Sequence, residues 1–295
     1  MTGYLDRLFS LDGLVAVVTG GSSGIGRAIA GGLAHAGARV VVMAREERRL
    51  DETVRELRAA GRAAVAVSVD VGDRDALARA ADAAAGEFGE PDILVNSAGI
   101  NLRPPMDSLT MADWDQTIAV NLSAPFVLGQ RFGPRMAERG WGRIINIASQ
   151  QAVRAFSNSG AYGASKGGLV SLTRSQSEAW APRGVCCNAI SPGFVLTPLT
   201  AEVGQDPARS AALAARTMTG RNGQAADFEG VAVFLASRVF PTPPGPVTVT
   251  SRYRSSRPAT SAVSPTRPTK LVNAVARPCA PPAARPAPPC TTPIP

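Results

Sequence analysis

The sequence predicts an α/β fold with one doubly wound parallel sheet, and two features of the chain support this prediction. Six short apolar runs alternate with longer segments rich in Ala, Arg and Glu that have the length and composition of helices. Each apolar run is continuous rather than alternating with polar residues, as expected where helices cover both faces of a sheet. Strands and helices should therefore follow one another in turn.

The six predicted strands cover residues 14–19, 39–43, 64–69, 93–95, 143–148 and 185–190. The main predicted helices occupy the intervals, at about residues 24–36, 46–60, 73–88, 113–139 and 161–181. In sheets of this kind, ligands bind at the carboxyl ends of the strands. Functional residues are therefore expected directly after the predicted strands.

The first predicted strand runs into a glycine-rich turn that contains Gly20, Gly24 and Gly26, and a helix begins there. Gly20 would allow a sharp turn, Gly24 a close approach of the backbone to a pyrophosphate, and Gly26 tight packing of the helix. The helix N-terminus would offer N–H groups to the phosphates. This context of strand, turn and helix predicts a Rossmann-like dinucleotide site rather than an ordinary turn.

The end of the second strand carries the residue expected to distinguish NADP from NAD. Arg45 stands where an acidic residue would bind the ribose hydroxyls of NAD, and an arginine can accommodate the 2′-phosphate of NADP. Glu46 and Glu47 would repel a phosphate if they turned inward, and Arg45 can also be interpreted as the start of the charged face of the next helix. NADP(H) is thus favoured slightly over NAD(H). Asp70, after the third strand, is expected either to receive the adenine amino group or to lead into the next helix.

Three residues beyond the fifth strand have the chemistry needed for proton transfer to a ketone. Ser149 follows the strand, and Tyr162 and Lys166 lie four residues apart on one face of the predicted helix. A nearby ammonium would lower the pKa of the Tyr162 phenol from its ordinary value of about 10. Tyr162 would then donate a proton to the developing alkoxide while Ser149 hydrogen-bonds the same oxygen. The predicted reaction is hydride transfer between a nicotinamide and an alcohol or ketone.

In this order and spacing, these motifs resemble the short-chain dehydrogenase/reductase family over residues 14–237. The stretches that carry the resemblance are residues 19–26, Asn96-Ser97-Ala98-Gly99, Ser149, Tyr162-Gly163-Ala164-Ser165-Lys166 and Pro192-Gly193. The usual Asn-Asn-Ala-Gly stretch of the family is varied here to Ser at position 97. Residues 99–105 and 149–166 look similar to the gluconate 5-dehydrogenase and 2-deoxygluconate 3-dehydrogenase branch of the family.

The resemblance implies roles for further residues. Asn121 would complete the catalytic set by holding a water that relays protons through Lys166, and Asn96 would brace the central strands near the cofactor. Besides Tyr162 and Lys166, the residues expected to bind the cofactor are Gly20, Ser22, Ser23, Gly24, Ile25, Gly26, Arg45, Asp70, Val71, Asn96, Ala98, Gly99, Pro192, Gly193, Val195 and Thr197.

The predicted substrate pocket is lined by residues 100–107, 150–159 and 194–221, of which the last segment is long enough for a lid, a surface excursion being the alternative. The lining is unusually polar for a steroid or fatty-acyl pocket, and an arginine can pair bidentately with a carboxylate. A small-molecule substrate of the sugar acid or polyol class is therefore expected. The candidate substrate residues are Arg103, Gln150, Gln151, Arg154 and Asn158, with Asn101 also in the lining.

The net charge of +8 arises in the C-terminal part of the chain. Residues 1–237 hold equal numbers of basic and acidic residues, whereas residues 238–295 hold eight basic residues, no acidic residue and 15 of the 24 prolines. Such a composition cannot bury a core. We therefore predict a dinucleotide-binding and catalytic domain over residues 1–237 and a disordered, basic, proline-rich tail over residues 238–295.

The tail stands where members of the family normally have a last strand and an Asp-Gly-Gly stretch. A shift of reading frame in the gene would produce such a composition, and a genuine interaction tail is the alternative. Loss of the strand would remove covering contacts from the cofactor and place the homo-oligomer usual in the family in doubt. A catalytically impaired dinucleotide-binding or interaction protein is then the alternative function.

Other classes of protein fit the composition less well. The eight tail cations are scattered, which predicts no specific nucleic-acid partner. His35 is the single histidine, so hydrolases that need a histidine base and histidine metal sites are disfavoured, and no metal is expected. The chain has no apolar run of about 18 residues and no signal-like apolar segment near Met1, so a cytoplasmic protein without membrane association is expected.

Overall fold

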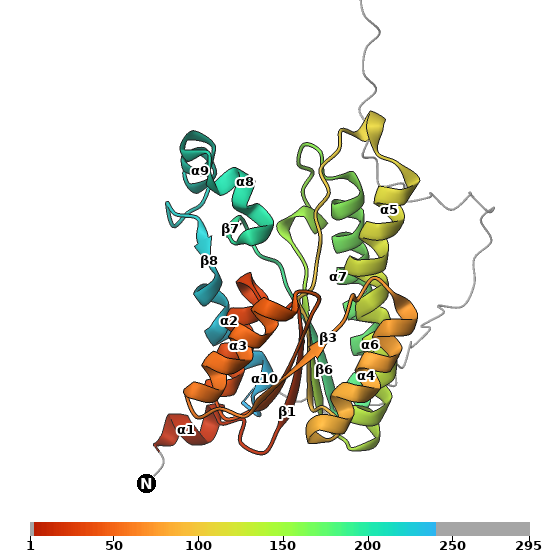
Figure 1. The fold of residues 1–295 in the computed structure, drawn as a ribbon, viewed down its shortest axis with the longest axis vertical. Helices are drawn as coiled ribbons and strands as arrows, with labels where there is room; N and C mark the ends of the chain where they lie inside the picture. Colours follow the sequence, from red (N-terminus) through yellow and green to blue (C-terminus); the bar gives the residue numbers. More distant parts are fainter. Residues whose placement is uncertain (1–2, 240–295) are drawn as a thin grey trace, which may run out of the picture. The chain divides into compact units, whose positions relative to one another are not determined.

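The main sheet of the molecule has six parallel strands in the order β3-β2-β1-β4-β5-β6, in a computed structural model that describes residues 3–239 (Figure 1). Its strands are β1 (Val15–Thr19), β2 (Arg39–Ala44), β3 (Ala64–Ser68), β4 (Ile93–Asn96), β5 (Gly142–Ile147) and β6 (Val185–Ile190). Each lies within one residue of its predicted bounds, and the predicted fold class is confirmed. The tail from residue 240 onward, with its predicted disorder, lies outside the described residues.

Helices cover both faces of this sheet. In Figure 1, α2, α3 and α10 lie on one side of it, and α4, α6 and α7 lie on the other. Their bounds, with those of α1 and α5, are α1 (Tyr4–Phe9), α2 (Gly24–His35), α3 (Glu47–Ala59), α4 (Arg74–Phe88), α5 (Met111–Ile118), α6 (Ala124–Glu138), α7 (Gly160–Trp180) and α10 (Glu229–Ala236). Among residues 3–239, no helix has the length and apolarity needed to cross a membrane.

Alternate side chains of the central strands enter two hydrophobic cores, one on each face. In β1, Ala16 and Val18 pack in one core with Leu33 of α2, and Val17 packs in the other with Leu128 of α6. Full burial of an aliphatic side chain of this size is worth about 1.5–3 kcal/mol. The edge strand β3 fully buries only its first residue, so the continuous burial predicted for every strand is wrong there, because less of the fold covers an edge.

The order of the sheet reverses between β1 and β4, which creates a crevice at their carboxyl ends. The Thr19 hydroxyl ties the two ends together by donating to the Val95 carbonyl at 3.4 Å and accepting from the N–H groups of Ser97 and Ala98 at 3.1 and 3.2 Å. Gly20 has a φ of +67°, and a Cβ there would lie 2.7 Å from the Ala98 nitrogen. Glycine therefore lets the loop after β1 approach the loop after β4.

Two segments depart from simple alternation of strand and helix. The helix predicted over residues 113–139 is interrupted by a π-helical turn, η2 (Ala119–Ser123), between α5 and α6.

After β6, the chain forms a small separate sheet of β7 (Val195–Leu196) and β8 (Gly223–Gln224), with α8 (Ala201–Gly204) and α9 (Pro207–Ala214) between them. This segment, residues 194–222, is named the lid segment after its predicted role, and it stands beyond the carboxyl ends of the main strands (Figure 1).

Candidate active site

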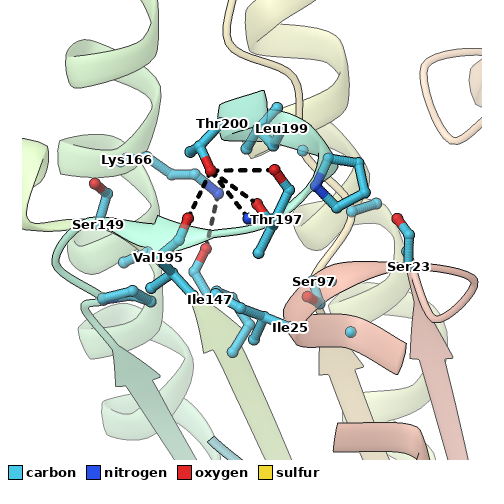
Figure 2. Close-up of a pocket in the computed structure, with 18 of the residues that line it drawn as sticks. Ser23, Ile25, Ser97, Ile147, Ser149, Lys166, Val195, Thr197, Leu199 and Thr200 are labelled. Carbon is cyan, nitrogen blue, oxygen red and sulfur yellow. Dashed lines mark hydrogen bonds between the residues drawn. The ribbon is translucent and has the colours of Figure 1, made fainter. Parts of the chain in front are cut away.

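A pocket of about 170 Å³ opens at the carboxyl ends of the central strands. Its walls come from the loops after β1, β4, β5 and β6, from α7 and from the start of the lid segment. Figure 2 shows Ser23, Ile25 and Ser97 toward one end of it and Ser149 and Lys166 toward the other. The pocket thus connects the glycine-rich turn with the residues predicted to transfer protons.

The turn before α2 has the properties of a phosphate cradle. The first N–H groups of a helix have no partner within the helix, and Gly24, Ile25 and Gly26 occupy this position on the pocket wall. The side chain of the N-cap residue, Ser23, makes no capping hydrogen bond to them. A Cβ at Gly26 would collide with the Gly20 carbonyl, so glycine is needed for the close turn. These residues fit the pyrophosphate of a dinucleotide.

Most residues predicted to bind the cofactor lie in the pocket wall. They are Gly20, Ser23, Gly24, Ile25, Gly26, Ala98, Gly99, Tyr162, Lys166, Pro192, Gly193, Val195 and Thr197. Further lining residues that were not predicted are Ser97, Ile147, Ala148, Pro198, Leu199 and Thr200. These residues could have been predicted from the sequence, because they lie at the ends of strands, directly after them, or next to Thr197.

Five predicted cofactor residues do not line this pocket. Ser22 and Val71 are buried, and Asn96 is buried between strands, where its side-chain amide donates to the Asn146 oxygen at 2.8 Å. This contact ties β4 to β5, consistent with the bracing role expected of Asn96. Arg45 and Asp70 lie at the ends of β2 and β3 and face each other at 3.6 Å, each with about half of its side chain exposed.

Ser149 and Tyr162 lie on a wall shared by the cofactor pocket and a second, adjoining pocket. Ser149 is placed by the end of β5 and by the short turn η3 (Gln150–Ala152), whose Gln151 N–H donates to its hydroxyl at 3.1 Å. Tyr162 projects from the first turns of α7 and is 8% exposed. A carbonyl in the adjoining pocket would therefore have both hydroxyl groups on the side that faces the cofactor.

The electrostatics of Tyr162 correct one expectation from the sequence. Burial raises the pKa of Tyr162 above its ordinary value, and the smaller lowering effects come from its hydrogen bond with Ser149 and from the charge of Arg103. Lys166 was expected to supply the lowering charge, but its ammonium instead donates to the Ile147 carbonyl at 2.7 Å. In this state the phenol keeps its proton, as required for a group that donates it to an alkoxide.

Lys166 is itself a buried residue of the pocket wall. Its side chain is enclosed by α7 and the end of β5, and burial lowers the pKa of its ammonium to about 8. The amine is therefore mostly protonated at pH 7 but titrates within the range of ordinary assays.

Asn121 lies in the π-helical turn between α5 and α6, where the extra residue shifts the direction of the side chains that follow. Its amide oxygen accepts from the Ile100 N–H, and its amide nitrogen donates to the Ile100 carbonyl and the Ser165 hydroxyl, at 2.9 to 3.1 Å. Its oxygen and the Lys166 amine both lie near the position a Cβ of Gly99 would take. Asn121 thus joins the loop after β4 to α7, and the predicted water relay stays a prediction.

The second pocket contains part of the predicted substrate set. Asn101, Arg103, Gln150 and Gln151 line it, together with residues of the lid segment. With its amide oxygen turned toward the guanidinium, Asn101 accepts from Arg103 at 3.1 and 3.2 Å, which holds the arginine in place. The pocket lies against Ser149 and Tyr162 and is the candidate substrate site.

Arg154 and Asn158 are not brought to this pocket, contrary to the prediction. They line a neighbouring hollow formed with Met106 and Val153. The cause is the short turn η3, after which the Arg154 N–H bonds back to the Gln150 carbonyl at 3.1 Å and the chain leaves the pocket wall.

Comparisons with known proteins agree with this geometry. Residues 14–208 match the family model described as short chain dehydrogenase. D-threitol dehydrogenase of Mycolicibacterium smegmatis is 43% identical over 79% of this chain and 89% of its own length. Gluconate 5-dehydrogenase of Gluconobacter oxydans is 38% identical over 78% of this chain and 90% of its own. A crystal structure of a gluconate 5-dehydrogenase from Burkholderia cenocepacia, in complex with NADP and tartrate, is 38% identical, with a TM-score of 0.75 over 79% of this chain and 92% of that one.

Proposed function

The chain belongs to the short-chain dehydrogenase family, and we propose that it interconverts the secondary alcohol of a sugar acid and the corresponding ketone, using NADP(H). It is an NAD(P)-dependent oxidoreductase that acts on CH–OH groups. The observation that carries the proposed substrate class is the position of Arg103 and three side-chain amides in the pocket that shares Ser149 and Tyr162 with the cofactor pocket.

We assign the proton steps of this proposal to residues of the two pockets. The nicotinamide, when bound, supplies or accepts the hydride. In the direction of reduction, the Tyr162 O–H bond breaks and its proton passes to the oxygen that was the carbonyl of the substrate. Ser149 hydrogen-bonds the same oxygen and stabilises its developing charge. Lys166 and Asn121 hold the adjoining loops and α7 in position through Ile147, Ile100 and Ser165. In oxidation the same proton transfer runs in reverse.

The lining favours a polyhydroxylated carboxylate over an apolar ketone. Amide groups of Asn101, Gln150 and Gln151 can donate to and accept from several hydroxyls, and Arg103 can pair with a carboxylate. Gluconate 5-dehydrogenase of Burkholderia cenocepacia was crystallised with tartrate, which carries both kinds of group. D-threitol dehydrogenase, by its name, acts on a neutral polyol, so an uncharged polyol is the second candidate substrate.

A paired comparison of substrates tests the proposal. Purified full-length protein is expected to oxidise D-gluconate with NADP⁺ with a kcat/KM at least about tenfold above that for sorbitol, its neutral counterpart, because a charge-assisted hydrogen bond contributes roughly 1.5–3 kcal/mol. Formation of NADPH is followed by absorbance, with 5-ketogluconate and D-threitol in the same panel. Equal or better turnover of the neutral polyols would favour the second candidate. NADPH binding without any turnover would favour a non-catalytic protein.

Arg45 supports the preference for NADP(H). Its guanidinium lies at the carboxyl end of β2, beside Asp70, and is exposed enough to meet a 2′-phosphate. The ion pair with Asp70 would favour side-chain positions of Arg45 near this point. Assembly into a homo-oligomer stays a prediction.

Replacement of Arg45 by serine is expected to weaken NADPH binding about tenfold or more and leave NADH binding nearly unchanged, since only NADPH carries the phosphate. Dissociation constants for both nucleotides are measured by fluorescence titration. Arg48→Ser is the matched control, because Arg48 is an exposed arginine of α3 that pairs with Glu52. A ratio of the two constants that is the same in Arg45→Ser and the wild type would show that Arg45 does not select the cofactor.

A further inference from the structure

The lid segment brings a second arginine to the candidate substrate pocket. Arg209 is the third residue of the lid helix α9 and lines the pocket with Leu213 of the same helix and Val203 of α8. The same pocket is lined by Arg103, from the loop after β4. Two arginines that are about one hundred residues apart in the chain thus line one pocket.

The charge of this pocket is not balanced by protein groups. No aspartate or glutamate is among its lining residues, which include two guanidinium groups. Eight arginines elsewhere in residues 3–239 form ion pairs with carboxylates, and Arg103 and Arg209 are not among them. An anionic ligand would neutralise this charge, whereas a neutral polyol would leave its compensation to solvent, since Arg209 is exposed and Arg103 partly exposed.

The backbone of α9 is held in place on both sides of Arg209. The Asp206 carboxylate accepts from the Arg209 N–H at 3.0 Å and caps the helix, so it bonds the main chain of Arg209. The next residue, Ser210, accepts from the Asn222 amide through both its carbonyl and its hydroxyl, at 3.0 and 2.9 Å. Arg209 is therefore placed on the pocket wall by a fixed helix start. The residue is exposed, so its side chain is open to a ligand as well as to water.

We propose that Arg209 is a specificity-determining residue that binds the carboxylate of the substrate together with Arg103. The proposal rests on the proposed function and sharpens its substrate class: aldonates and ketoaldonates, whose carboxylate lies between the two arginines while the reacting carbon lies at Ser149 and Tyr162. The lid segment thereby contributes to recognition as well as to covering the site.

The test compares charged and neutral substrates in variants of one residue. Arg209→Met is expected to lower the ratio of kcat/KM for D-gluconate to that for sorbitol about tenfold, mainly through KM for gluconate. Arg209→Lys should recover part of the ratio, because it keeps the charge but not the planar fork. Arg174→Met, which removes an exposed charge of α7 away from both pockets, should leave the ratio at the wild-type value.

A binding measurement separates failure of this proposal from failure of the proposed function. Tartrate is titrated into each protein saturated with NADPH, and binding is followed by the fluorescence of the reduced nicotinamide. Tenfold weaker binding in Arg209→Met supports the role of Arg209 even if the wild type proves unable to oxidise gluconate. Unchanged tartrate affinity and an unchanged gluconate to sorbitol ratio in Arg209→Met would overturn it, and so would a wild type that binds no carboxylate. A loss confined to Arg103→Met would leave the sugar-acid function standing without Arg209.

Discussion

Replacing Tyr162 by phenylalanine is expected to lower kcat for the reduction of a ketone substrate by about a thousandfold, because general acid catalysis contributes between 10² and 10⁴. The change removes one oxygen and keeps the ring, which is buried between the cofactor and substrate pockets. The Ser149 hydroxyl would still reach the substrate oxygen, so some stabilisation of the alkoxide should remain. The loss should appear in kcat far more than in the dissociation constant of NADPH.

Tyr4→Phe is the matched control for this variant. Tyr4 is 68% exposed in α1, near the N-terminus of the chain, and it lines neither pocket. Steady-state kinetics and NADPH titration are made on both variants, with circular dichroism to check the fold. A Tyr162→Phe protein that retains a tenth or more of wild-type kcat would show that another group donates the proton.

The alternating strands and helices of the main sheet could be predicted from the sequence. So could the site residues that directly follow a strand or share one face of a helix. The strands are bounded by abrupt changes from apolar to polar residues, which is why their ends could be placed closely. Ser149 follows such a strand, and the spacing of Tyr162 and Lys166 describes one helix face whatever surrounds it. The glycine-rich turn after β1 was recognisable for the same reason, since its function follows from local backbone geometry.

Features that depend on tertiary contacts were not predictable in this way. The raised pKa of Tyr162 results from burial beneath several loops, whereas the sequence showed only the neighbouring lysine. Arg154 has the same chemistry as Arg103, but the η3 turn directs it to another hollow. Arg209 follows a local N-cap, Asp206, but its place at the pocket also depends on the bond from Asn222 to Ser210, which joins residues twelve positions apart in the folded lid.

The same distinction applies to Asn121. The resemblance of the motifs pointed to this residue, but the π-helical turn that carries it was hidden inside an apparently continuous helix over residues 113–139. One extra residue in a helical turn shifts the hydrophobic pattern by only a single position, which does not divide the segment into two helices in the sequence. It does change which neighbours the Asn121 amide can reach, and here those neighbours are Ile100 and Ser165.

Replacing Lys166 by methionine is expected to reduce turnover to below about 1% of wild type. Its bond to the Ile147 carbonyl holds the end of β5 against α7 beside Tyr162, and a well-positioned general acid–base group contributes at least 10². It should also change how stability depends on pH. The amine is fully buried, and burial lowers its pKa in the folded state to about 8, from about 10.4 in an unfolded chain. Between these two values the unfolded state binds the proton and the folded state does not, so raising the pH through this window stabilises the wild type.

The size of the effect follows from the two pKa values. Between pH 7 and pH 9.5 the wild type should gain about 2 kcal/mol in free energy of unfolding relative to Lys166→Met, which lacks the titrating group. Chemical denaturation of both proteins at several pH values gives the difference directly, and groups common to both cancel in it. Parallel stability curves would mean that Lys166 titrates alike in both states. The loss of activity would then need a cause other than a buried ammonium. Stability curves that converge or diverge only below pH 7 would show that a different residue titrates. The buried Lys166 amine is therefore expected to destabilise the fold at neutral pH, and removal of its charge tests the chemistry and the energetics of the site in one variant.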